Sequence, residues 1–305
     1  MHGRAQLGPP VSRPAIIMQT VATFSIVACD LKAQAWGVAV ASKFPAVGSV
    51  VPWARAKVGA LATQALANTS FGPRGLELME NSLGAEETLT KLLAVDPGRE
   101  SRQVGIVDRE GNSATFTGKE CMDWAGGISH PGYAIQGNIL AGPEVIRHME
   151  TAFLSSSGLL PDRLLTALEA GNLAGGDRRG RQSAAIYVVK PRGGYGGFND
   201  RWIDYRVDDH LNPIPKLQDL LELHHLYFGK SPKSRRVTLE GPVVTELQRI
   251  MKSLGYYTST DGVYDDATRE AFRAFINNEN FEERADPAAG WIDQPVLDYL
   301  LKKLS

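Results

Sequence analysis

At 305 residues the chain is longer than one average domain, so its length predicts two domains. A formal net charge of −1 gives it no general attraction to nucleic acid, so we expect no nucleic-acid partner. No apolar run is long enough to span a membrane, and the only cysteines, Cys29 and Cys121, lack metal-ligand spacing, so we expect no membrane insertion, metal or cofactor.

Residues 1–21 are predicted to be a disordered extension, with a later start at Met18 as the alternative. Their only compact apolar piece runs from Ala15 to Met18 and is bounded by Pro14. That piece is too short for the apolar region of a signal peptide. The sequence therefore predicts a cytoplasmic protein, while association with the cell envelope stays open.

Strand patterns recur from residue 22 to residue 207. In the first of them Phe24, Ile26 and Ala28 alternate with their neighbours in a period of two. It forms a predicted hairpin with 35–42, because DLKAQ between them supplies a turn. The other predicted strands are 57–66, 102–108, 113–118, 133–139, 182–189 and 201–207.

Predicted helices lie between these runs of strands. Pro143 is placed to open one of them, and Gly171 is placed to close another. Strand runs followed by helix pairs predict an α+β protein with stacked sheets and helices outside them. The predicted helices are 72–83, 85–95, 143–153, 161–171 and 213–229.

A change of composition marks the predicted linker at residues 229–237. GKSPKSRR holds four basic residues and a proline, whereas 237–305 carries seven Lys/Arg against twelve Asp/Glu. Three helical patterns follow in 238–305. The first ends at Gly255, Asp266 is expected to cap the second, and Asp293 precedes the third. A small three-helix domain is predicted.

Several stretches of the first domain resemble one known family. They are TFSIVACD, GRESRQVGIVD, YAIQGNILAGPEV and GGDRRGRQSAAIYVV, together with the long run from Gly37 to Met79. Together they make residues 22–228 similar to the bacterial family DUF1028, which resembles the N-terminal-nucleophile (Ntn) hydrolases. The resemblance implies a four-layer αββα sandwich, two antiparallel sheets between layers of helices.

The resemblance also implies a catalytic role for Thr23. In an Ntn hydrolase the first strand begins with Thr, Ser or Cys, and the free α-amine of that residue activates its own hydroxyl. Thr23 matches this position. The simpler interpretation is that Thr23 is a β-branched residue that starts a strand by propensity alone.

Two features depart from the Ntn pattern. Ala22 precedes Thr23, so Thr23 has an amide in place of an amine unless the preceding residues are removed. Ntn enzymes of the proteasome type also carry a lysine beside the nucleophile, which lowers the pKa of the amine. The nearest match here is Ser49, and Lys57 lies further along the chain.

Five further residues are expected to bind substrate on the same resemblance: Gln64, Gly137, Asn138, Asp177 and Arg181. Asp177 is similar to an aspartate that precedes a late strand, and YAIQGN resembles the strand-to-helix turn beside the nucleophile. Arginines at 178–181 have the fork geometry that suits a carboxylate. The simpler alternatives are a solvated loop for the arginines and buried, hydrogen-bonded amides for Gln64 and Asn138.

Residues 238–305 resemble peptidoglycan-binding modules. The resemblance rests on VTELQRIMKSLGYY, DGVYDDATREAFRAF and GWIDQPVLDYLLKKL. It implies that a peptidoglycan fragment is the ligand. Alternatively, Tyr256, Tyr257, Tyr264 and Trp291 simply fill a small core.

Three functional hypotheses follow from these patterns. The leading one is an Ntn-type amide hydrolase acting on a small amide or peptide, with an appended binding module. The alternatives are a catalytically inactive Ntn-like scaffold that binds a small molecule or a protein, and a binding protein of the cell wall. A homodimer is an assembly that the sequence allows.

Overall fold

The structure is a computed structural model that describes residues 23–256 and 259–304. Its contacts divide the chain into two compact units, with the boundary between Leu217 and Gln218. The predicted extension 1–21 and Tyr257 lie outside the described residues. Within the described ranges, none of the helices combines the length and apolarity needed to cross a bilayer.

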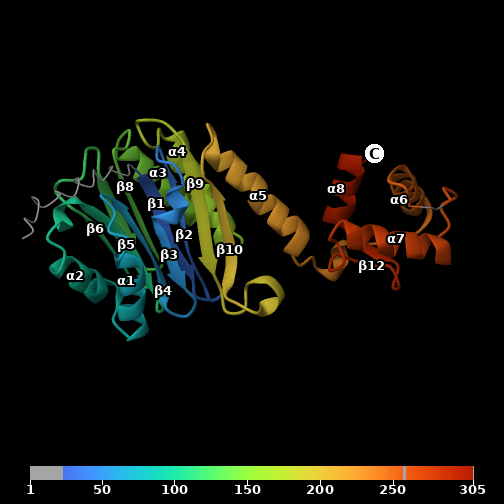
Figure 1. Ribbon diagram of the computed structural model, residues 1–305, viewed down its shortest axis with the longest axis horizontal. Helices are drawn as coiled ribbons and strands as arrows, with labels where there is room; N and C mark the ends of the chain where they lie inside the picture. The colour runs from blue at the N-terminus through green and yellow to red at the C-terminus, as the bar shows by residue number, and fades with distance from the viewer. Residues whose placement is uncertain (1–22, 257–258, 305) are drawn as a thin grey trace, which may run out of the picture. The chain divides into compact units, whose positions relative to one another are not determined.

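Two antiparallel sheets form the centre of the first unit (Figure 1). The larger sheet has the strand order β10-β9-β2-β1-β8-β7 and the smaller has the order β3-β4-β5-β6. The strands of the larger sheet are β1 (Thr23–Asp30), β2 (Ala35–Ser42), β7 (Gly126–His130), β8 (Tyr133–Asn138), β9 (Ser183–Val189) and β10 (Arg201–Val207). Those of the smaller sheet are β3 (Pro52–Arg55), β4 (Gly59–Ala65), β5 (Arg102–Asp108) and β6 (Ser113–Thr117).

Helices cover the outer face of each sheet, and the inner faces pack against each other. α1 and α2 lie against the smaller sheet, and α3 and α4 lie against the larger one. A long helix, α5, follows β10 (Figure 1). The helices are α1 (Phe71–Glu80), α2 (Ala85–Ala94), α3 (Glu144–Ser155), α4 (Leu160–Leu173) and α5 (Pro213–Phe228).

Both faces of strand β1 are covered by other elements, and all of its residues except Asp30 are buried. Val27 packs between the two sheets, in a cluster that includes Ala60 and Ala62 of β4. Phe24 points the other way and lies against Gly171 of α4. Alternate residues of β1 therefore serve two separate cores, as the period of two predicts.

The antiparallel sheets and the helical C-terminal region that the sequence predicts are confirmed. Strands β3 and β7 were not predicted. Each is an edge strand and each is short, with Pro52 opening one and a glycine pair opening the other, so neither carries the usual strand pattern.

The expected role of Gly171 as a helix cap is wrong, because α4 continues to Leu173. Gly171 is instead buried inside the helix, where a Cβ atom would lie 2.6 Å from Cγ of Met149 in α3. The glycine lets these two helices approach closely.

The second unit combines helices with a small sheet of three short strands, in the order β11-β13-β12. The sequence predicted the helices but not the sheet. Its core is built around fully buried phenylalanines, Phe272, Phe275 and Phe281. The elements are α6 (Gly241–Ser253), α7 (Asp266–Asn278), α8 (Gln294–Leu304), β11 (Arg236–Thr238), β12 (Ala285–Asp286) and β13 (Trp291–Asp293).

The N-cap of α7 is Asp265, whereas the sequence pattern placed the cap at Asp266. The Asp265 carboxylate accepts a hydrogen bond from the backbone N–H of Thr268 at 2.8 Å. Asp266 is the first helical residue and pairs with Arg269 at the surface. The cap therefore lies one residue earlier than predicted, since adjacent aspartates give the same sequence signal.

We expect Asp265→Ala to destabilise the second unit by about 1 kcal/mol, because it leaves a helix N–H without its acceptor. Asp266→Ala is the matched control and should cost less than about 0.5 kcal/mol, the usual value of an exposed helical ion pair. Hydrogen exchange of the amides of α7 measures both. Equal effects of the two substitutions would contradict this assignment of the cap.

Candidate functional site

A row of four polar residues crosses the larger sheet at the point where β1 begins. The pairing register places Thr23 directly opposite Ser42 of β2 on one side and Asn138 of β8 on the other, and Ser42 opposite Ser183 of β9. Residues directly opposite in an antiparallel pair point to the same face. All four are at most 2% exposed, and the Thr23 hydroxyl donates to Oγ of Ser42 at 3.3 Å. We call these four residues the strand-end row.

The smaller sheet presents a second polar row toward the first. Gln64 of β4, Gln103 of β5 and Thr117 of β6 are register partners at the same end of the molecule. Nε2 of Gln64 donates to the carbonyl of Thr23 at 3.3 Å and to Oε1 of Gln103 at 2.9 Å. Gln64 therefore reaches the Thr23 backbone across the interface of the two sheets.

The hydrogen bonds of this network determine which way the Asn138 amide points. Nε2 of Gln103 donates to the carbonyl of Gly137 at 2.7 Å, so its Oε1 is the acceptor for neighbouring amides. Nδ2 of Asn138 is one of these amides and donates to Oε1 of Gln103 at 3.0 Å. Oδ1 of Asn138 is thereby left buried, with no partner among the described residues.

An unpaired buried acceptor is costly, typically about 1–3 kcal/mol, and such atoms are rare in native proteins. Asn138 lies directly opposite Thr23, so its Oδ1 is an unused acceptor beside the first residue of β1. The Asn138 side chain can therefore accept one hydrogen bond from an N–H or O–H donor at this site.

Asp177 lies in line with β1, just ahead of Thr23. Its Oδ2 accepts from the backbone N–H of Lys43, which follows Ser42, at 2.8 Å. Asp177 also forms a bridge with Leu140, two residues after Asn138. Since β2 and β8 flank β1, a residue that joins both of their ends stands before the start of β1.

The remaining two predicted site residues lie further from the Thr23 hydroxyl. Gly137 is paired with Phe24, so it faces the helix layer, where a Cβ atom would lie 2.5 Å from Leu140. Its carbonyl accepts from Gln103, which ties it to the network. Arg181 is exposed, and its Nη1 donates to Oδ1 of Asn212 at 3.3 Å.

The positions considered for a lysine do not supply one beside Thr23. Ser49 lies exposed in a short 3-10 helix, where its hydroxyl donates to the carbonyl of Ala46 at 2.7 Å. Lys57 is exposed in the turn between β3 and β4. Lys43 is nearer in sequence to the strand-end row, but its Nζ donates to the carbonyl of Arg181 at 3.4 Å.

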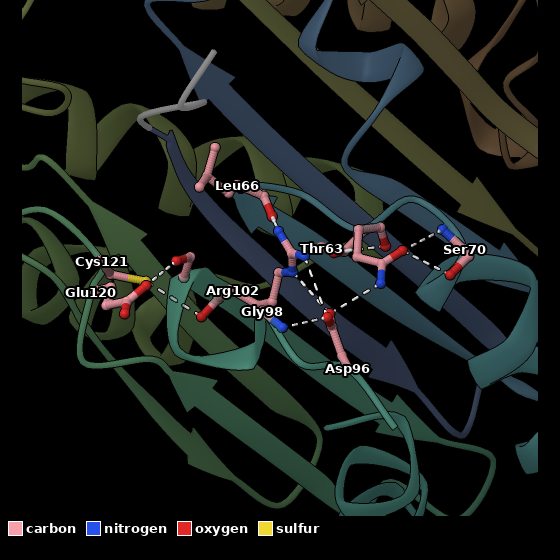
Figure 2. Close-up of polar contacts among 10 residues, drawn as sticks. Thr63, Leu66, Ser70, Asp96, Gly98, Arg102, Glu120 and Cys121 are labelled. Carbon is pink, nitrogen blue, oxygen red and sulfur yellow. Dashed lines mark hydrogen bonds and ion pairs between the residues drawn. The ribbon is translucent and has the colours of Figure 1, made fainter. Parts of the chain in front are cut away.

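A charged network holds the loop that follows Gln64 (Figure 2). The Asp96 carboxylate accepts from Nε of Arg102 at 2.9 Å, from Nδ2 of Asn68 at 3.0 Å and from the N–H of Gly98 at 2.9 Å. Arg102 also donates to the carbonyl of Leu66. Because Arg102 adjoins Gln103, this network fixes the loop next to the second polar row.

The pKa of Asp96 is lowered from its ordinary value of 3.8 to about 2, chiefly by the hydrogen bond from Arg102. A lowered folded-state pKa stabilises the protein above the unfolded value, and this stabilisation is lost as the pH falls through the folded value. At about 1.4 kcal/mol per pKa unit, Asp96→Asn should lower the free energy of unfolding by about 2 kcal/mol at pH 7.

That difference from the unaltered chain should shrink between pH 4 and pH 2, measured by urea unfolding with tryptophan fluorescence. Glu87→Gln is the control, because Glu87 forms an exposed pair with Lys91 at 3.3 Å and should matter little at either pH. A difference for Asp96→Asn that is the same at pH 7 and pH 2 would contradict the role of its charge.

The sequence did not single out Ser42, Ser183 or Gln103 as site residues. Ser42 is the last residue of the predicted strand 35–42, and Ser183 is the second residue of the predicted strand 182–189. The sequence thus placed both near strand ends without revealing that they share a row with Thr23. The described residues contain no group of three or more His, Cys, Asp or Glu side chains placed to hold a metal ion. The site therefore offers hydroxyls, amides and one carboxylate.

The first unit is thus an α+β protein of two packed antiparallel sheets, whose polar strand ends gather around Thr23. The chain belongs to DUF1028, a family of unknown function, whose model matches residues 23–217. A second model, described as "Putative peptidoglycan binding domain", matches residues 227–300. Both resemblances inferred from the sequence are confirmed.

One solved structure supports the family assignment. The crystal structure of protein SPO2555 from Silicibacter pomeroyi, also of DUF1028, is 32% identical in sequence to this chain, with a TM-score of 0.61. The match covers 67% of this chain and 89% of the other. No curated protein matches the chain.

Proposed function

We propose that the first unit is an Ntn-type amide hydrolase whose nucleophile is the hydroxyl of Thr23. Its two packed antiparallel sheets, with a pair of helices on each outer face, have the layer order expected of an Ntn-like αββα sandwich. Layer order by itself does not define an activity, so the proposal depends on the site.

The observation that carries the proposal is the position of Thr23. It is the first residue of β1, and its hydroxyl is held by Ser42. Once Thr23 is the amino terminus, its α-amine has a pKa near ~8 and is partly unprotonated at neutral pH. That amine then serves as the base that takes the proton from the hydroxyl during attack on an amide carbonyl. It passes the proton to the substrate nitrogen as the C–N bond breaks, and water then hydrolyses the ester left on Thr23.

Two neighbours have roles in this proposal that match their geometry. The unused Oδ1 of Asn138 accepts one N–H of the new amine and so orients its lone pair. The carboxylate of Asp177, ahead of Thr23, stabilises the ammonium that forms when the amine takes up the proton. Backbone N–H groups at the strand ends stabilise the tetrahedral intermediate.

One observation favours the inactive scaffold as a second candidate. Thr23 is 0% exposed in the full chain, so a substrate has no access to its hydroxyl. In the hydrolase proposal, removal of residues 1–22 creates the α-amine of Thr23. In the scaffold hypothesis Thr23 stays a buried strand residue, and the protein only binds.

The test is to compare the full chain with a chain that begins at Thr23. We expect the trimmed chain to hydrolyse members of a panel of small amides and peptides, and the full chain to be inactive. Intact mass confirms the terminus of each sample before assay. If the full chain hydrolyses a substrate as fast as the trimmed chain, activation by the Thr23 amine is wrong; if neither is active, the scaffold hypothesis is favoured.

For the second unit we propose binding of peptidoglycan fragments, supported by its family model over 227–300. Tyr256 and Tyr264 pack edge-on against the core rings of Phe275 and Phe272, so part of the aromatic set fills the core. Trp291 instead lies under the guanidinium of Arg236, 3.7 Å from the ring centroid. It is the member of this set that we expect to contact a glycan.

A further inference from the structure

A hollow of about 660 Å³ opens next to the strand-end row in the first unit. Ser42 and Ser183 of that row line it, as does Asp177. Since Ser42 accepts the hydrogen bond of the Thr23 hydroxyl, the hollow lies one side chain away from Thr23. Its volume is in the range typical of sites for small molecules, about 300–1,000 Å³.

Three cationic side chains and one carboxylate are the charged groups that line this hollow. Lys43, Arg178 and Arg181 are all exposed and border it. The carboxylate of Asp177 is already bound by the N–H of Lys43 and by the backbone and guanidinium of Arg179. The Asp177 carboxylate is therefore not available to neutralise the cations that line the hollow. The hollow is locally positive, although the whole chain has a net charge of −1.

The Arg178 guanidinium is the cation best placed for a ligand. It makes no hydrogen bond and no ion pair with any residue that the structure describes, whereas Arg181 is partly held by Asn212. The backbone N–H of Arg178 donates to the carbonyl of Ile139 at 3.0 Å, which fixes the base of the side chain. A guanidinium on a fixed backbone favours bidentate binding of a carboxylate.

Apolar residues also line the hollow. They include Phe24, Leu211 and Ile214, and Leu211 is 82% exposed. A lining that combines apolar residues with cations suits a molecule that combines an apolar body with a negative charge. Bare inorganic anions would leave the apolar residues unused.

We propose that this hollow binds an amide that carries a free carboxylate, with the carboxylate on Arg178 and Arg181 and the apolar part against Phe24 and Leu211. The inference rests on the proposed hydrolase function, for which it names the substrate class: N-acyl amino acids and related carboxylated amides. Neighbouring strands lie ~4.8 Å apart, so a molecule held beside Ser42 lies about one strand spacing from Thr23.

The first test is equilibrium binding to the full chain and to its Thr23→Ala variant, neither of which needs to hydrolyse anything. The probes are N-acyl amino acids, such as N-benzoylglycine, each paired with its neutral primary amide, and inorganic phosphate as the bare anion. We expect carboxylates to bind at least about tenfold more tightly than their amides and than phosphate. Raising the salt concentration should weaken binding of the carboxylates and leave binding of their neutral amides unchanged.

Substitution of single arginines tests where the carboxylate binds. Arg178→Gln and Arg181→Gln should each weaken carboxylate binding about tenfold and leave binding of the neutral amides unchanged. Arg74→Gln is the matched control, because Arg74 is an exposed arginine of α1 outside the hollow, and it should change nothing. Thermal unfolding shows that each variant is folded.

Several results would overturn the inference: carboxylates that bind no better than their amides, phosphate that binds as well as the carboxylates, or an equal loss on Arg74→Gln. These results are separate from those for the hydrolase proposal. Carboxylate binding with an inactive trimmed chain supports the hollow and favours the scaffold hypothesis over the hydrolase. A trimmed chain that hydrolyses neutral amides with the same kcat/KM as carboxylated ones keeps the hydrolase and refutes the carboxylate site.

Discussion

A chain that begins at Thr23→Ala is expected to hydrolyse amides at least about a thousandfold more slowly than the chain that begins at Thr23. Loss of a nucleophile commonly costs this much or more in kcat, because no other group replaces the covalent step. In the strand-end row, the hydroxyl of Ser42 accepts the hydrogen bond of the Thr23 hydroxyl at 3.3 Å. Single-turnover assays with the best amide of the panel provide the measurement.

Two further substitutions at the same position separate chemistry from shape. Thr23→Ser keeps the hydroxyl and the terminal amine, so it should retain activity within about tenfold. Thr23→Val has nearly the shape of threonine without its hydroxyl, and should be as inactive as Thr23→Ala. A Thr23→Val chain that keeps most of the activity would assign the attack to another group, with Ser42 the first to examine.

The sequence predicted the elements of the first unit better than their arrangement. Period-two patterns such as that of Phe24, Ile26 and Ala28 identify strands because each face of β1 packs against a different core. The edge strands β3 and β7 escaped prediction because few residues in them are enclosed, so burial left little pattern in their sequences. The prediction that Gly171 ends a helix was also wrong. A glycine that allows two helices to pack closely and a glycine that ends a helix give the same signal in the sequence.

The sequence named individual candidate residues for the site, but it did not predict how they are arranged. Family resemblance pointed to Thr23, Asn138 and Asp177, and the structure places all three around the start of β1. Pairing register depends on contacts between distant segments, so the row formed with Ser42 and Ser183 left no local signal. The unpaired Oδ1 of Asn138 is likewise a property of the whole network.

A buried ion pair in the second unit leads to the other large expected effect. Nε of Arg284 lies 2.8 Å from Oδ2 of Asp293, and both side chains are at most 6% exposed. Arg284 also donates to the carbonyls of His225 and Leu226 near the end of α5, at 2.8 and 2.7 Å. One guanidinium thus pairs with the carboxylate and donates to two carbonyls in the last turn of α5.

We expect Arg284→Met to destabilise the second unit by about 3–5 kcal/mol, because it leaves the Asp293 carboxylate buried without its partner. Adding Asp293→Leu should recover much of this loss, since replacing both members of a buried pair by apolar residues is often close to neutral. Arg273→Met is the control: its pair with Glu270 is 2.7 Å long but exposed, so it should cost less than about 1 kcal/mol. Hydrogen exchange of α6, α7 and α8 in the full chain measures all three, and similar losses for Arg284→Met and Arg273→Met would refute the role of burial.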